Sequence, residues 1–125
     1  MSQVKMSQVE EGLRLAMAFV DAFNQHDTAA IDAIISDGCV FESARPAPLG
    51  LRYEGRAFVT QAIGAFFEAA PDMKMLIEDA YGQGKHSVLR WKIVGLKGAP
   101  DARRGVDLFT AQDGRISEIL AYAKG

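Results

Sequence analysis

Asp107 is the residue of this sequence with the clearest capacity for chemistry, because it interrupts an apolar run, Gly105-Val106-Asp107-Leu108-Phe109. A carboxylate on a buried strand loses hydration, which raises its pKa. Such a group can donate a hydrogen bond to a substrate carbonyl or shuttle a proton near neutral pH. The alternative is a solvated sheet face, on which Asp107 would pair with Arg90, Lys92 or Arg104.

Two tyrosines are candidate partners of that aspartate or of its ligand. Tyr122 is predicted to lie on the strand beside Asp107, and its buried hydroxyl could pair with the carboxyl group. The alternative for Tyr122 is an amphipathic residue at the rim of the sheet. Tyr53 lies in a loop before a helix, where it either closes over a pocket mouth or anchors the loop.

The large apolar side chains are candidates for the wall of a ligand pocket or for ordinary core. Those considered for the wall are Phe19, Phe41, Met73, Met75, Leu89, Trp91, Ile93 and Phe109. Packing in the core must explain most of them, since wall and core are continuous in a small domain.

The sequence predicts no metal site and no cofactor. No His, Asp and Glu set has ligand spacing, and there is no phosphate-binding or dinucleotide fingerprint. His26, between two helices, is expected to be exposed, and His86 to lie at a strand rim. Cys39 lacks a cationic neighbour in sequence and is interpreted as a small buried apolar residue.

Length and composition favour one globular domain of 125 residues, with residues 1–8 frayed. The single cysteine excludes an internal disulfide and favours a cytoplasmic location. No apolar stretch is long enough to span a membrane. A net charge of −2 argues against a nucleic-acid-binding protein.

Basic side chains are concentrated in residues 85–104, where six lysines and arginines accompany one acidic residue. This stretch either forms the solvated outer side of a strand pair or a basic rim that attracts an anionic ligand or acidic partner.

Apolar spacing predicts three helices, over residues 9–24, 28–36 and 56–70. Asp27 and Thr28 provide an N-cap for the second helix, and Pro71 ends the third. The first helix is apolar over most of its circumference, so other elements must enclose it.

The period then changes to two, which indicates strands. The sequence predicts a strand at 39–43, a loop at 44–54, and four further strands after residue 72 with a loop at 96–102. Asp113-Gly114 is a strong hairpin signal between the last two strands. Helices followed by a run of strands predict an α+β fold with an antiparallel sheet.

Five segments in this order resemble the nuclear transport factor 2-like superfamily, in its SnoaL-like and ketosteroid-isomerase-like branch. They are FVDAFNQHD (19–27), DGCVFES (37–43), YEGRAFVTQAIGAFFEAAPDM (53–73), VLRWKIVG (88–95) and GVDLFTAQDGRISEILAY (105–122). The resemblance implies a cone-shaped α+β barrel, in which three N-terminal helices pack on a strongly curved antiparallel sheet. It also implies an apolar pocket at the open end.

The same resemblance assigns roles to four positions. Asp107 matches the oxyanion-hole aspartate of the isomerases through the VDLF phrase. Their general-base aspartate falls on Ser43, with Glu42 one residue earlier, and their oxyanion tyrosine falls on Phe19. Serine is not basic and phenylalanine has no donor, so steroid isomerisation by that route is not expected.

Two functions follow from these residues. The first is an acid/base isomerase, cyclase or lyase acting on a small, largely apolar carbonyl compound, with Asp107 as acid and with Tyr122, Glu42 or Ser43 assisting. The second is a non-catalytic module of the same fold that binds a small ligand or dimerises. A homodimer is expected through the outer sheet face, to which alternation assigns Val88, Val94, Val106, Leu108 and Ile119.

Overall fold

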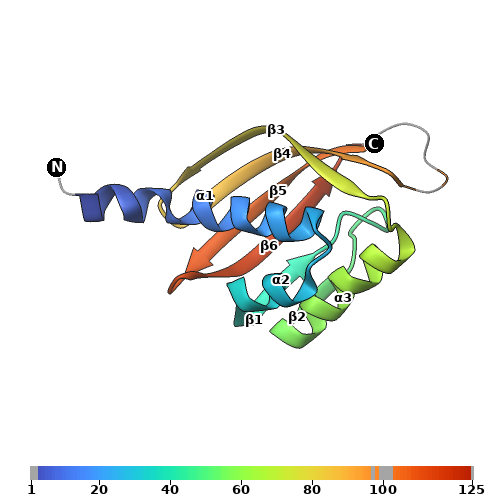
Figure 1. Cartoon of the computed structure of the whole chain (residues 1–125), viewed down its shortest axis with the longest axis horizontal. Coiled ribbons are helices and arrows are strands. Elements are labelled where there is room, and N and C mark those ends of the chain that lie inside the picture. The colour runs from blue at the N-terminus through green and yellow to red at the C-terminus, as the bar shows by residue number, and fades with distance from the viewer. Residues whose placement is uncertain (1–2, 97, 99–102, 125) are drawn as a thin grey trace.

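The computed structural model of the chain describes residues 3–96, 98 and 103–124, which form three helices and one six-stranded sheet (Figure 1). The helices are α1 (Gln3–Asn24), α2 (Thr28–Ile34) and α3 (Arg56–Ala69). The strands are β1 (Ile35–Glu42), β2 (Arg52–Glu54), β3 (Lys74–Gln83), β4 (His86–Val94), β5 (Arg103–Gln112) and β6 (Arg115–Ala123). The predicted α+β fold class is confirmed.

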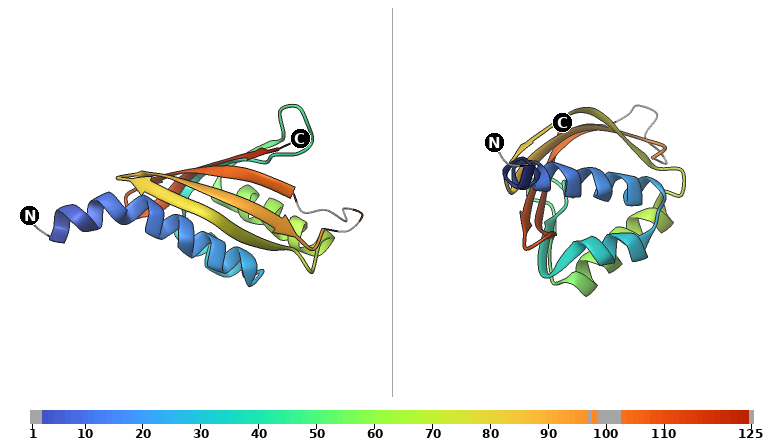
Figure 2. Two further views of the ribbon diagram at one scale, coloured as in Figure 1. Left: turned by 90° about the horizontal axis from the view of Figure 1, so that it is seen from above. Right: turned by 60° about the vertical axis from the view of Figure 1, so that its left-hand side comes forward.

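The sheet has the strand order β2-β1-β6-β5-β4-β3 and is curved without closing (Figure 2). Strands joined by hairpins pair antiparallel, as the sequence predicts, but β1 pairs with β6 in parallel. The expectation of a wholly antiparallel sheet is therefore wrong for this pair. Turn residues indicate the pairing only of strands that are neighbours in sequence. Most of the chain separates β1 from β6, so no turn signal indicates how these two strands pair.

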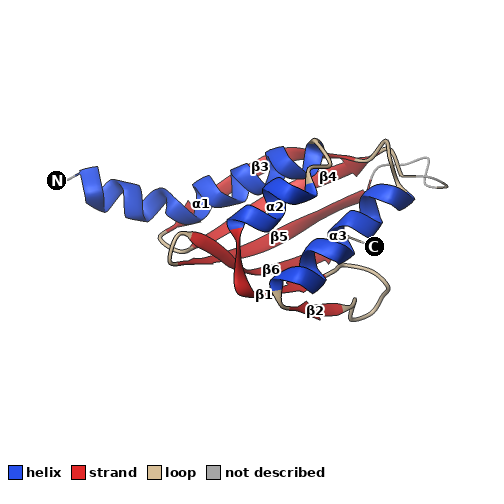
Figure 3. Ribbon diagram, turned by 60° about the horizontal axis from the view of Figure 1, so that its bottom comes forward, coloured by secondary structure: helices blue, strands red, loops and turns tan. Residues whose placement is uncertain are grey.

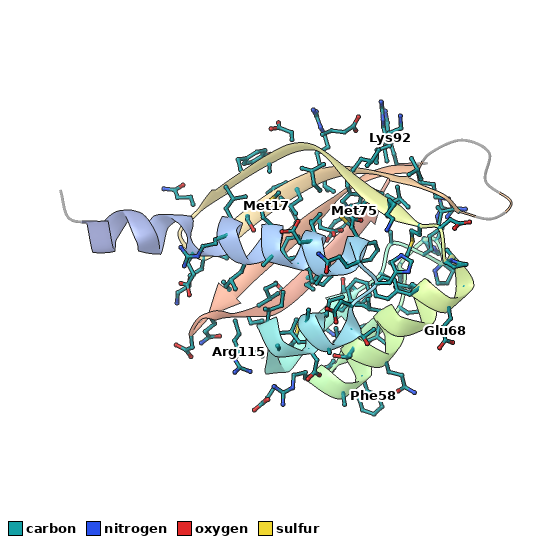
Figure 4. All side chains as sticks on the ribbon, viewed as in Figure 1. Met17, Phe58, Glu68, Met75, Lys92 and Arg115 are labelled. Atoms are coloured by element: carbon teal, nitrogen blue, oxygen red, sulfur yellow. The ribbon has the colours of Figure 1, made fainter. Side chains whose placement is uncertain are left out.

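All three helices lie on the concave side of the sheet (Figure 3). Alternation along β5 explains why: Phe109 and Ala111 are buried against the helices, whereas Leu108 and Thr110 on the other face are only half-buried. Met75 points between α1 and the sheet, and Lys92 extends from the convex face (Figure 4). None of the described helices is long and apolar enough to cross a membrane.

The predicted element boundaries hold to within a few residues except at the start of α1, six residues before the predicted start at Val9, and in two other places. Helix α2 ends at Ile34, and β1 begins at Ile35, inside the predicted helix. A short strand, β2, lies at the end of the predicted loop at 44–54. The predicted loop at 96–102 lies mostly outside the described residues. Helix α1 begins at Gln3, and fraying of residues 1–8 stays a prediction.

Helix α1 is attached to β3, the edge strand of the sheet, through side chain and backbone. The Asn24 amide nitrogen donates to the Met75 carbonyl at 2.8 Å, and the Asn24 amide oxygen accepts from the Met75 N–H at 2.7 Å. Near the other end of β3, the Gly12 N–H donates to the Gly84 carbonyl at 3.0 Å. These contacts fix α1 across the concave face, where it forms one wall of the interior.

Candidate functional site

The concave face of the sheet and the helices enclose a cavity of about 190 Å³. Aromatic and methionine side chains make most of its wall, among them Phe19, Phe23, Phe41, Met73, Met75 and Trp91. Of the described residues that line it, the polar and charged ones are Ser43, Arg45, Arg103 and Asp107. The chemistry of the cavity therefore depends on very few groups.

Asp107 is the acidic residue of this cavity. It lies in the middle of β5, between Leu89 of β4 and Ala121 of β6 in the register of the sheet, and is 4% exposed. The Trp91 indole Nε1 donates to its Oδ1 at 2.9 Å. Its second oxygen, Oδ2, has no hydrogen bond to the residues that the structure describes, which leaves it for a ligand.

Burial raises the pKa of the Asp107 carboxyl from 3.8 to about 7, while the hydrogen bond from Trp91 acts in the opposite direction. Desolvation is the larger effect because the surrounding wall is apolar and carries one N–H donor toward the carboxylate. Asp107 is thus divided between its acid and base forms near neutral pH, which suits a group that both takes and returns a proton.

The orientation of Trp91 depends on Gly105, its Cα partner on β5. A Cβ atom at position 105 would lie 2.5 Å from Cη2 of the Trp91 ring and 2.2 Å from the Tyr122 carbonyl oxygen. Only glycine leaves room for the indole ring to lie across β5. Gly105 therefore positions the donor that reaches Asp107.

Six of the eight residues considered for the pocket wall line the cavity: Phe19, Phe41, Met73, Met75, Trp91 and Ile93. Leu89, Phe109 and the loop tyrosine Tyr53 are not among its described lining residues. Phe109 is 2% exposed and packs edge-on against Phe19, with ring centroids 5.5 Å apart. Tyr53 stacks on Phe41 at 5.9 Å, behind the cavity wall. Both support wall residues from outside the cavity.

Ser43 lines the cavity, but its hydroxyl organises the loop after β1. Ser43 Oγ donates to the Arg45 carbonyl at 2.6 Å and accepts from the Leu51 N–H at 3.1 Å. Its proton and one lone pair are therefore engaged with backbone. Glu42 faces the other way and pairs with Arg52 at 2.7 Å outside the cavity. The structure does not bring Glu42 to Asp107.

Tyr122 is also outside the cavity, so its predicted contact with Asp107 is wrong. A bulge between Thr110 and Ala111 shifts the β5–β6 register by one residue, so that Tyr122 lies opposite Val106. The Tyr122 side chain is 53% exposed on the convex face. The same shift turns Ile119 inward, where it is fully buried, and overturns its predicted place on the outer face.

The basic stretch at 85–104 is divided between the two faces, and Lys97 and Asp101 lie outside the described residues. Arg90 and Arg104 lie on the convex side, where Arg104 pairs with Glu78 at 3.3 Å. Arg103 lies on the concave side and lines the cavity. Sequence reasoning did not select it, although alternation places Arg103 on the face of Asp107.

The remaining candidate groups do not extend the site. Burial raises the pKa of the Cys39 thiol to about 12, which leaves it protonated. His26 is half-buried rather than exposed, because its ring stacks on Phe67 at 4.3 Å and its Nε2 lies 2.9 Å from the Met73 carbonyl. Among the described residues, no three His, Cys, Asp or Glu side chains gather as they would around a metal ion.

Comparison with solved structures supports the fold throughout the chain. An NTF2-like protein of unknown function from Mesorhizobium loti is 34% identical, with a TM-score of 0.83 and coverage of 94% of each chain. A candidate ketosteroid isomerase from Kribbella flavida is 17% identical over 96% of this chain and 82% of its own, with a TM-score of 0.78.

A candidate SnoaL-like polyketide cyclase from Jannaschia sp. CCS1 is 15% identical over 94% of this chain and 88% of its own, with a TM-score of 0.78. No curated protein matches the chain. The sequence model of the SnoaL-like domain matches residues 16–119, which include α2, α3 and strands β1 to β5 in full. This chain therefore belongs to the SnoaL-like domain family of the NTF2-like superfamily.

Proposed function

We propose that this protein binds a small, largely apolar carbonyl compound in the cavity and moves a proton on it through Asp107. The activity would be that of an isomerase, cyclase or lyase. A cytoplasmic location, favoured by the single cysteine, is part of the proposal. The observation that carries the proposal is the buried carboxyl group of Asp107, whose free oxygen meets an apolar cavity.

The chemistry follows from the two forms of Asp107. The carboxylate removes a proton from the carbon beside the carbonyl group. The C–H electron pair forms a C=C bond to the carbonyl carbon, and the C=O π pair moves onto oxygen, which gives an enolate. The carboxylic acid then returns the proton, to the same carbon or to another one. A group whose pKa is about 7 performs both halves near neutral pH.

The size of the cavity limits the ligand. An engineered apolar cavity of roughly 150 Å³ accepts benzene, whereas drug-sized ligands occupy roughly 300–1,000 Å³. A cavity of about 190 Å³ therefore suits one ring with a small substituent. The isomerase groups are also absent at Ser43 and Phe19, so a steroid is not the proposed ligand.

Exchange of substrate protons for deuterium tests the proposal without knowledge of the natural substrate. Cyclohexanone and acetophenone are incubated with the protein in D₂O, and loss of the α-proton signals is followed by NMR. We expect exchange faster than in buffer, and a loss of about a hundredfold or more in Asp107→Asn. Glu68→Gln, a change of an exposed carboxylate on α3, should leave the rate unchanged. An Asp107→Asn rate equal to that of wild type would refute the role of Asp107.

A non-catalytic ligand-binding module is the second candidate, and one observation favours it. The structure brings neither Tyr122 nor Glu42 to Asp107, so no second proton-transfer side chain accompanies it among the described lining residues. Binding of the ketones, seen as changes in protein NMR shifts, without any accelerated exchange would select this function.

We further propose that the convex face pairs two copies of the chain. Exposed apolar side chains, Leu76, Tyr81 and Tyr122, lie around half-buried Val88, Val106, Leu108 and Leu120. Small domains seldom leave such a face in water. Arg90 and Lys92 interrupt the apolar surface and would meet acidic groups such as Glu118 across a two-fold axis.

A further inference from the structure

Arg103 is placed to act on whatever enters the cavity. It is the first residue of β5, and alternation sets it on the same face as Asp107, four residues away. It is half-buried and lines the cavity, as does its Cα partner on β4, Ile93. A guanidinium group thus lies at one end of a largely apolar wall and a carboxyl group lies farther in.

Arg103 brings a positive charge to the cavity. Among the described residues no ion pair joins Arg103 to a carboxylate, whereas its neighbour Arg104 pairs with Glu78 on the convex face. Asp107 is the only described acidic residue of the lining, and it is protonated in part near neutral pH. An anion would meet favourable charge here.

We propose that the ligand carries a carboxylate group, which Arg103 binds while the carbonyl-bearing part of the ligand lies against Asp107. The inference rests on the proposed function, because it specifies the class of carbonyl compound. The two Cα atoms are about 13 Å apart along the strand, and the arginine side chain covers part of that span. A keto acid with one ring between its two oxygen groups fits this separation. The guanidinium fork binds a carboxylate through two parallel hydrogen bonds.

Two matched probes test the inference, 4-acetylbenzoate and its neutral analogue 4-acetylbenzamide. Trp91 is the single tryptophan and lines the cavity, so its fluorescence reports binding of either probe. We expect the carboxylate to bind about tenfold more tightly than the amide. Arg103→Gln should remove that difference by weakening carboxylate binding alone. Arg104→Gln, one residue away on the convex face, should leave both affinities unchanged.

The two probes distinguish failure of the carboxylate-binding role of Arg103 from failure of the proposed function. Equal affinity of the wild-type protein for both probes, or an equal effect of Arg104→Gln and Arg103→Gln, would overturn the role of Arg103 and leave the ligand cavity standing. Binding of neither probe at millimolar concentration would overturn both. Unchanged amide affinity in Arg103→Gln shows that the cavity of the variant is intact.

Discussion

Neighbouring residues along β5 lie on opposite faces of the sheet, so residues of similar type are in different environments. Arg103 and Asp107 lie on the concave face, where the cavity wall removes water from Asp107. Arg104 lies on the convex face and pairs with Glu78, with both side chains partly in solvent. Exposed ion pairs of this kind contribute at most about 1 kcal/mol. A step of one residue along β5 therefore separates Arg103, which lines the cavity, from Arg104, an ordinary surface charge.

The face of the strand, more than the residue type, decides what each side chain can do. Glu42 shows the same rule on β1. It is a carboxylate near the cavity in sequence, yet it faces Arg52 and solvent. Ser43, the next residue, lines the cavity. Variants on the two faces should therefore differ in their effects.

The concave face should make stability depend on pH through Asp107. Its folded-state pKa of about 7 exceeds the ordinary 3.8, so the folded protein holds an extra proton between these values. The contribution of Asp107 to stability is therefore complete below about pH 4 and is lost as the pH rises to about 7, by on the order of 4 kcal/mol. Asp107→Asn should remove this loss, as measured by urea unfolding at several pH values.

The matched surface variant, Glu68→Gln on α3, should keep the wild-type dependence on pH. A wild-type stability that stays level between pH 4 and pH 8 would mean that Asp107 remains hydrated. Its assignment as a buried acid would then be wrong.

The convex face should control assembly. Leu108→Asp places an unpaired charge in the proposed interface, at a cost of about 3 kcal/mol or more. Sedimentation equilibrium should give roughly twice 13.6 kDa for the wild type and a shift toward the monomer for this variant. Phe58 on α3 is 65% exposed on the opposite side of the molecule (Figure 4), so Phe58→Asp should remain dimeric. A wild-type monomer at high concentration would refute the dimer.

The smallest expected effect concerns the hydrogen bond between Trp91 and Asp107. This bond favours the carboxylate by about 1.5 kcal/mol. Trp91→Phe should therefore raise the pKa of Asp107 above about 7, as followed by NMR titration of the carboxyl carbon. A lowered pKa would show that the smaller ring admits water, and that hydration outweighs the lost bond.

Much of the fold could be predicted from the sequence because its signals are local. Helical spacing, Pro71 and the Asp113-Gly114 turn each act within a few residues, and the structure keeps them close to their predicted places. The same is true of Asp107, whose burial follows from the apolar residues around it. The parallel pairing of β1 with β6 depends on segments far apart in sequence. It has no local signal.

The residues of the candidate site were harder to predict, because a single bulge between β5 and β6 determines which side chains of β6 face the cavity. Counted from the Asp113-Gly114 turn without a bulge, Tyr122 would lie opposite Gly105 and face the cavity. The extra residue on β6 reverses the faces of Tyr122 and Ile119 together. Positions 110 and 111 are threonine and alanine, so no glycine or proline there indicates the shift in register from the sequence. Both wrong assignments thus have one physical cause.

The attachment of α1 to β3 has a consequence for the behaviour of the protein in a crowded solution. A sheet that ends in an open edge strand can recruit strands from other chains, which is a route to aggregation. Here the Asn24 side chain already occupies the N–H and C=O of Met75, and the Gly12 N–H occupies the Gly84 carbonyl beyond the other end of the strand. An incoming strand that paired along the whole of β3 would have to displace α1 at both ends of the strand. The helix that forms one wall of the cavity therefore also protects the two ends of this sheet edge.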